Sequence, residues 1–267
     1  MDLTNKLTLQ SVTNLEDLKI YHQLRDKVFQ EEQSFVADSP KVINIILQTD
    51  IEVKSILATQ EYYDAFSSLI EKKLSSQNST PTLYIATKEQ MQTLVGHKLH
   101  HNAMLHGVRP KPTPLEALDD NIIMLDSITS TENIGSIARS AAALGVNSYL
   151  IPSNAPHPYS RRSLRVSMGH ISKLNFHIYN DIKETIPFLQ KQGYKVFAAE
   201  VAEDAIKLQD VVVPKKWVIL MGHEGKGLSK EIIELCDSCV EIEMNGEVRS
   251  FNVGVAASLL MYSFKMK

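Results

Sequence analysis

The chain has 267 residues, of which 43% are apolar and 22% are charged, and its formal net charge is −3. These values are typical of a globular protein with one large or two ordinary domains. They exclude a polycationic protein, so nucleic-acid binding would have to come from local basic patches. No apolar run approaches the roughly 20 residues of a membrane-spanning helix, and the two cysteines give no disulfide framework. We therefore expect a cytoplasmic protein without a signal peptide or membrane segment.

The first half of the chain alternates between helical and extended patterns. Residues 15–33 predict an amphipathic helix, because Leu18, Tyr21, Leu24 and Val28 recur at spacings of three and four. A helical or buried segment is predicted at 42–47, helices at 60–73 and 88–95, and strands at 55–58, 82–86 and 103–108. The alternation predicts a small α/β domain.

A stretch without acidic residues lies at the end of this half. Residues 91–115 contain no Asp or Glu, but they include Lys98, Arg109, Lys111, His97, His100, His101 and His106. The histidine spacing matches no common zinc pattern and lacks a cysteine or carboxylate to complete a site, so we predict no metal. A partly exposed basic surface is the simpler interpretation, and it is a candidate for contacts with RNA phosphates.

The sequence RPKPTP at 109–114 predicts a stiff linker, because proline at every second position blocks both helices and central strands. We place a domain boundary near residues 109–120, with domains at 1–112 and 119–267. The second half predicts strands at 122–125, 148–151, 174–178, 195–199, 217–221 and 240–244, and helices at 134–144, 182–192 and 229–236. This order predicts an α/β domain with a mostly parallel sheet.

The sequence GHEGKG at 222–227 follows a buried strand. It is not a Walker A loop, because Leu228 stands where Lys and then Ser or Thr would be needed, and a dinucleotide-binding pattern fails at Lys230. Three glycines in six residues indicate backbone folded tightly around a ligand, with a plain turn as the alternative. The pair Cys236 and Cys239 is interpreted as buried thiols.

Two further segments carry polar residues at helix positions. Asn133 stands at a predicted helix start, and Arg139 follows it in a helix of small residues, where a solvated Arg is the alternative to a functional one. The stretch 240–263 predicts a strand, a polar loop and a helix capped by Ser250, with Asn252 in its first turn. A strand end, a glycine loop and a helix start together expose backbone groups that can hold a polar small molecule.

A second acid-free stretch at 157–173 includes Arg161, Arg162 and Arg165. These arginines are predicted to contact RNA phosphates with little reading of base sequence, together with Arg109. A solvated helix face is the alternative.

Taken together, three segments resemble the motifs of the SpoU (TrmH-type) RNA 2′-O-ribose methyltransferases of the SPOUT superfamily. They are NIGSIAR at 133–139, MGHEGKGL at 221–228, and IEM at 242–244 with SFNVGVA at 250–256. The resemblance covers roughly residues 120–267, and its strength is that all three motifs occur in order. The first half is more loosely similar to the L30e-like substrate-binding domain found in many members.

The resemblance implies an α/β fold in which a trefoil-knotted SPOUT domain follows a small L30e-like domain. It implies S-adenosylmethionine as cofactor, no metal, and a homodimer whose active site draws on both protomers. The family's catalytic positions fall on Asn133, Arg139, Glu224, Ser250 and Asn252. Its cofactor-binding positions fall on Gly222, Ile242 and Phe251, with Met244 nearby. Phe251 replaces the leucine that is usual there, and Ser130 to Glu132 replace the usual turn residues.

Chemistry supports this assignment, because a ribose 2′-hydroxyl is a poor nucleophile that must be positioned and must lose its proton. A guanidinium is essentially always protonated, so Arg139 is expected to stabilise the developing alkoxide, while a role as base would need strong perturbation. Glu224 is expected to pair with Arg139 or to hold the loop. The alternative function is an RNA-binding protein of the same fold without catalytic activity, and base methylation is disfavoured. The L30e-like domain favours ribosomal over transfer RNA by analogy only.

Overall fold

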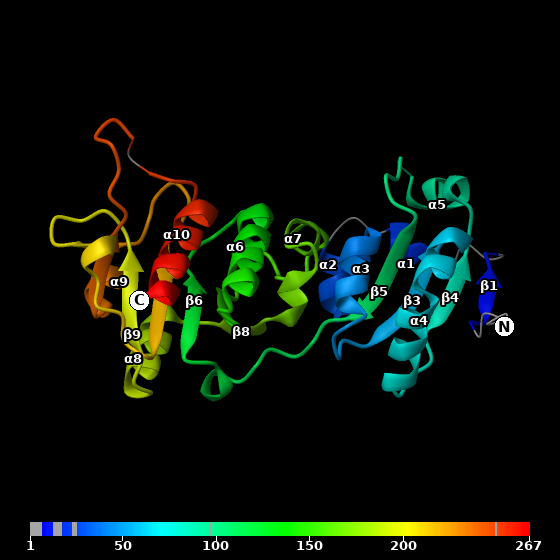
Figure 1. The fold of residues 1–267 in the computed structure, drawn as a ribbon, viewed down its shortest axis with the longest axis horizontal. Coiled ribbons are helices and arrows are strands. Elements are labelled where there is room, and N and C mark those ends of the chain that lie inside the picture. Colours follow the sequence, from blue (N-terminus) through cyan, green and yellow to red (C-terminus); the bar gives the residue numbers. More distant parts are fainter. Residues whose placement is uncertain (1–6, 13–17, 23–25, 97, 249) are drawn as a thin grey trace. The chain divides into compact units, whose positions relative to one another are not determined.

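The computed structural model describes residues 7–12, 18–22, 26–96, 98–248 and 250–267. The chain divides into two compact units (Figure 1). The first unit contains Met1–Lys111 together with Tyr159–Ser172, and the second contains Pro112–Pro158 and Lys173–Lys267. The sequence had placed the segment 159–172 in the second domain, whereas its contacts assign it to the first.

The first unit is built on a mixed sheet. Its described elements are β1 (Leu9–Ser11), α1 (Lys19–His22), α2 (Asp26–Glu31), β2 (Ser34–Asp38), α3 (Pro40–Ile46), β3 (Val53–Ala58), α4 (Gln60–Ser76), β4 (Thr82–Ile85), α5 (Lys88–Val95) and β5 (Ala103–Val108), with α7 (Arg161–Val166) added from the later segment. Among the described residues, the strands lie in the order β1-β4-β3-β5-β2. β5 runs antiparallel to both neighbours, and the other pairs are parallel.

The predicted helix over 15–33 is helical over most of its described residues and ends at Glu31. The described part of that stretch forms the two short helices α1 and α2, and 13–17 and 23–25 lie outside the described residues. The next strand, β2, escaped prediction because all five of its residues are buried, so it shows no alternation of polar and apolar side chains. The predicted elements at 60–73, 88–95 and 103–108 are confirmed to within a few residues.

The second unit is built on a parallel sheet, as predicted. Its elements are η2 (Leu115–Ala117), β6 (Asn121–Leu125), α6 (Thr131–Leu144), β7 (Ser148–Pro152), η3 (His170–Lys173, which reaches into it at Lys173), β8 (Asn175–Tyr179), α8 (Ile182–Lys191), β9 (Lys195–Ala199), β10 (Ile206–Lys207), η4 (Leu208–Asp210), β11 (Trp217–Met221), α9 (Lys230–Leu235), β12 (Ser238–Glu241) and α10 (Val253–Met266). Within the described ranges, the strand order is β10-β12-β9-β11-β6-β7-β8, and every strand pair is parallel.

Alternate residues of the central strand β11 point to opposite faces of the sheet, and all five are buried. Both faces of the sheet are therefore covered by helices. Val218 and Leu220 join the core cluster that includes Ile186 of α8. Trp217 packs edge-on against Phe264 of α10 on the other face, with ring centroids 5.3 Å apart. α10 also packs against α6 (Figure 1), so the helix that contains the first motif and the helix that begins within the third lie side by side.

Helix ends explain two differences from the predicted boundaries. α6 begins three residues earlier than expected because Ser130 is its N-cap and accepts the N–H of Asn133, so Asn133 lies inside the first turn. α10 begins at Val253 because Asn252, not Ser250, is its N-cap. Gly145 is the C-cap of α6, with a left-handed φ of 68°. No helix among the described residues is both long enough and apolar enough to cross a membrane.

Candidate functional site

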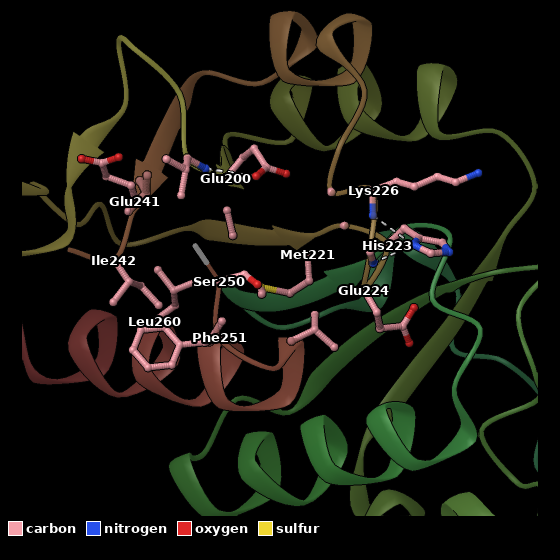
Figure 2. A pocket seen from close by; sticks show the side chains of 18 of the residues that line it. Glu200, Met221, His223, Glu224, Lys226, Glu241, Ile242, Ser250, Phe251 and Leu260 are labelled. Carbon is pink, nitrogen blue, oxygen red and sulfur yellow. Dashed lines mark hydrogen bonds between the residues drawn. The ribbon is translucent and has the colours of Figure 1, made fainter. Parts of the chain in front are cut away.

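A pocket of about 330 Å³ lies where the carboxyl ends of β9, β11 and β12 meet (Figure 2). The ends of neighbouring parallel strands reach the same edge of a sheet, where ligands of α/β proteins commonly bind. The loop 222–227 forms one wall, and Ile242, Met244, Ser250 and Phe251 form another. The first turns of α10 close the apolar end with Val253, Ala256 and Leu260. The second and third motifs therefore line one cavity.

The loop 222–227 is folded tightly upon itself. His223 and Gly227 exchange two backbone hydrogen bonds, from His223 N to Gly227 O and from Gly227 N to His223 O. A Cβ on Gly222 would lie 2.5 Å from the Gly227 carbonyl carbon, and Gly227 itself has a φ of 65°. Both glycines are thus required by the closure of the loop, and the loop as a whole lines the pocket.

A chain of hydrogen bonds joins the three motifs. The Glu224 carboxylate accepts from the backbone N–H groups of Thr129 and Ser130, and its Oε1 accepts from Asn133 Nδ2 at 3.0 Å. Asn252 Nδ2 in turn donates to Asn133 Oδ1 at 3.2 Å. Asn252 Oδ1 accepts from Gly254 N as the cap of α10. Glu224 therefore holds the loop before α6, one of the two roles expected for it, and Asn133 is oriented from both ends.

Electrostatics keep Glu224 ionised at neutral pH. Partial burial would raise the pKa of its carboxyl, but the hydrogen bonds from Asn133, Ser130 and Thr129 outweigh burial and lower the pKa below its usual value. A negative charge therefore lies at the rim of the pocket beside two amide side chains. That arrangement can orient a polar substrate through Asn133 and Asn252.

The structure places all four predicted cofactor-binding residues on the pocket wall. Gly222, Ile242, Met244 and Phe251 line the cavity, and so does the predicted catalytic residue Ser250. Ile242 and Phe251 lie with Leu260 at one side of the pocket in Figure 2, and Glu224 lies at the other. The strand predicted over 240–244 ends at Glu241, so Ile242 and Met244 belong to the loop that turns around the cavity.

Arg139 does not lie with the predicted site residues that line the pocket. It is exposed on α6, and in the described part of the chain it neither lines the pocket nor makes a hydrogen bond or ion pair. Nearby on the same helix, Ser136 and Ser140 face a shallow hollow of about 540 Å³ shared with Val255, Leu259 and Tyr262 of α10. The three side chains of α10 are between 40% and 56% exposed, which leaves an apolar helix face open.

The arginines predicted to bind RNA have different surroundings. Arg161 donates from Nε and Nη2 to Asp38 Oδ2 at 3.1 and 2.8 Å, and Arg165 pairs with both oxygens of the same carboxylate. Asp38 is only 4% exposed. Burial alone would raise the pKa of Asp38, but the two guanidinium groups outweigh it and lower the pKa. Arg161 and Arg165 thus fix α7 to β2, whereas Arg162 is exposed on the same helix.

Arg109 is also committed inside the first unit. It is 5% exposed and donates from Nε to the backbone carbonyl of Ser34 at 2.8 Å, so its guanidinium is not presented on the surface. His106 is half-buried in β5, and burial lowers its pKa to about 4, so it is neutral at pH 7. His100, His101, Lys98 and Lys111 are exposed, and His97 lies outside the described residues. No group of three metal-ligating side chains occurs in the ranges that the structure describes.

Sequence reasoning missed two carboxylates that line the pocket, Glu241 at the end of β12 and Glu200. Glu200 follows β9 and lines the cavity with Ala199 and Val201. The only sequence signal of Glu200 is a carboxylate directly after a buried strand, which is a weak pattern without knowledge of which strands are neighbours.

The two thiols are partly as expected, because Cys239 is buried and Cys236 is half-buried. Burial raises the pKa of the Cys236 thiol to about 12.

Comparison with known proteins agrees with the geometry. The sequence model of the SpoU rRNA Methylase family matches residues 120–262. A TrmH family tRNA/rRNA methyltransferase of Staphylococcus haemolyticus is 30% identical over 216 residues, which are 74% of this chain and 86% of that protein. An AdoMet-bound rRNA methyltransferase from Sinorhizobium meliloti superposes with a TM-score of 0.82 at 19% identity, covering 97% and 98% of the two chains. An RNA 2′-O ribose methyltransferase superposes with a TM-score of 0.73 at 18% identity over 96% and 98%.

Proposed function

The chain belongs to the SpoU rRNA Methylase family and is an RNA methyltransferase of the TrmH/SpoU type. On that premise, we propose that it methylates a ribose 2′-hydroxyl of ribosomal RNA with S-adenosylmethionine as donor. The observation that carries the proposal is the hydrogen-bonded chain Glu224–Asn133–Asn252 at the rim of a pocket lined by the third motif. A cavity of about 330 Å³ is within the range of small-molecule sites. Its apolar side, with Ile242 and Leu260, fits an adenine ring.

The proposed mechanism assigns each polar residue a step. S-adenosylmethionine supplies, when bound, a methyl group already activated on a sulfonium, so no metal is needed. As the ribose hydroxyl gives its proton to solvent water, Arg139 stabilises the negative charge that develops on the oxygen, because a guanidinium is a cation at neutral pH. Asn133 and Asn252 orient the acceptor through amide hydrogen bonds, and Ser250 contributes its hydroxyl from the pocket wall. Glu224 keeps Asn133 in its orientation.

The separation of Arg139 from the pocket supports a homodimer. We propose that a second copy covers the apolar face of Val255, Leu259 and Tyr262 and brings its own Arg139 to this pocket. The face adjoins Asn252 and Gly254, so a partner seated there would lie next to the site. Sedimentation at micromolar concentration tests the assembly, because a mass near the 30.0 kDa of one chain would contradict it.

The likeness in fold to SpoU methyltransferases supports a trefoil knot in the second unit. For the first unit we propose the L30e-like role of RNA binding, with its exposed basic residues, including Arg162, near phosphates. The ribosomal target is favoured over transfer RNA by the analogy of that unit. The second candidate function is an RNA-binding protein of this fold without turnover.

Methyl transfer to RNA distinguishes the two candidates. Labelled S-adenosylmethionine is incubated with the protein and total RNA from a strain that lacks it, with naked RNA and with ribosomal particles. The expected result is label at one linkage that resists alkaline cleavage, since 2′-O-methylation blocks attack by the neighbouring hydroxyl. Label at an alkali-sensitive site would contradict ribose methylation. No incorporation with either substrate would favour the RNA-binding protein.

A further inference from the structure

Glu200 is an acidic residue of the pocket that belongs to none of the three motifs. It follows β9 at the carboxyl edge of the sheet and lies between the end of β12 and the loop 222–227. Figure 2 shows it above Met221, with Ile242, Phe251 and Leu260 on one side and Glu224 on the other. It therefore lies on the pocket wall beside the loop 222–227, on neither the apolar side nor the side of Glu224.

Its carboxylate is fixed by the backbone. Oε2 accepts the N–H of Leu228 at 2.9 Å, and Oε1 accepts the N–H of Val201 at 3.1 Å. The group lies so close over Gly227 that a Cβ there would be 1.9 Å from Oε2. The glycine therefore leaves room for the carboxylate as well as for the turn. Each oxygen carries two lone pairs, so each keeps an acceptor position after its backbone bond.

No cation compensates Glu200 in the part of the chain that the structure describes. Its hydrogen-bond donors there are the two backbone groups, and the salt bridges of the same region involve other carboxylates. A half-buried carboxylate with two remaining acceptor positions, held rigidly in a ligand pocket, calls for donors on the ligand. Two adjacent donors would match its two oxygens.

We propose that Glu200 recognises the vicinal diol of the donor's ribose, with one hydroxyl donating to each carboxylate oxygen. The inference rests on the proposed function and names a residue that selects the donor. The ribose is the part of S-adenosylmethionine that carries two neighbouring hydroxyl donors, and it joins the adenine to the sulfonium. Glu200 lines the same pocket as the apolar residues and holds its carboxylate beside the loop 222–227, where such a diol can reach it. Carboxylates after parallel strands hold ribose hydroxyls in the same way in dinucleotide-binding folds.

The test measures how strongly the pocket prefers a ribose with both hydroxyls over a ribose that lacks one of them. A purely structural role of Glu200 would not affect that preference. Calorimetry gives the Kd of methylthioadenosine, which has the diol but no charge, and of its 2′-deoxy and 3′-deoxy analogues. Wild type is expected to prefer the diol by at least about tenfold, the usual effect of a hydrogen bond to a charged group. Glu200→Gln should reduce the preference to below about threefold. Glu203→Gln, at an exposed carboxylate outside the pocket lining, should keep the wild-type preference.

The possible outcomes separate the hypotheses. If Glu200→Gln weakens the three ligands equally and keeps the preference, Glu200 only supports the loop through Leu228, and the proposal is overturned. The proposal is also overturned if the wild-type protein binds methylthioadenosine and its two deoxy analogues equally well. If wild type binds neither methylthioadenosine nor S-adenosylmethionine, the donor assignment itself fails, which is a different result from the loss of discrimination alone. Thermal unfolding of each variant shows whether the pocket remains folded.

Discussion

The arginine on α6 and the two framework arginines on α7 have opposite surroundings. Arg139 on α6 is exposed and, among the described residues, makes no ion pair. Arg161 and Arg165 on α7 share the buried carboxylate of Asp38. The carboxylate comes from β2, 123 positions away from Arg161 in the chain. An exposed arginine and one that is bound to a buried carboxylate therefore look alike in sequence.

The comparison shows which information the sequence lacked. The stretch 157–173 contains no acid, which suggested cations available to phosphates. A buried salt bridge requires a partner that is close in space, however, and sequence distance gives no information about it. The small residues around Arg139 were the better signal, because α6 packs closely against α10 and leaves a long charged side chain outside the contact.

The largest effect is expected for Arg139→Ala. Methyl transfer should fall by about 1,000-fold, or about 4 kcal/mol, because removal of a group that stabilises developing negative charge costs this much in comparable sites. Calorimetric affinity for S-adenosylmethionine should stay within about twofold of wild type, since Arg139 does not line the described pocket. Single-turnover kinetics with RNA measure the first quantity. Transfer at the wild-type rate would show that Arg139 belongs with the framework arginines after all.

A smaller effect, on stability, is expected for Asp38→Asn. Loss of the shared carboxylate leaves two guanidinium groups without their anion. The free energy of unfolding should fall by about 3 kcal/mol. This value is in the lower part of the range for buried ion pairs, because the Arg165 side chain is 43% exposed. Urea unfolding of the full chain measures it. Glu31→Gln, at an exposed acid of the same unit, should change stability by less than about 0.5 kcal/mol.

The same carboxylate predicts a pH dependence. Because the folded-state pKa of Asp38 is lowered, the unfolded state binds a proton more readily than the native state does. The contribution of Asp38 is therefore complete above the unfolded pKa of about 3.9 and is lost as pH falls through the folded pKa. Wild type should lose stability more steeply than Asp38→Asn below about pH 4. Parallel curves for the two proteins would assign the acid sensitivity to other groups.

Much of the second unit could be predicted from sequence, because its strands are short apolar runs bounded by turn signals. The strand over 195–199 and the one over 217–221 end where predicted. The contacts between the motifs could not be derived from periodicity, because Glu224 and Asn133 meet only after the sheet brings the end of β11 next to β6. β2 and the bonds of Asp38 depend in the same way on pairing between distant segments.

The smallest effect is expected for Arg162→Ala, the exposed residue between the two framework arginines. If α7 contacts RNA, loss of one phosphate contact should reduce affinity by about threefold and lower the slope of log K against log salt by about 1. Binding to a ribosomal RNA fragment at several salt concentrations measures both values. Arg162→Lys keeps the charge and should keep the slope. An unchanged slope in Arg162→Ala would mean that α7 serves the framework of the first unit alone, and phosphate contacts would then have to come from other exposed cations, such as Lys98 and Lys111.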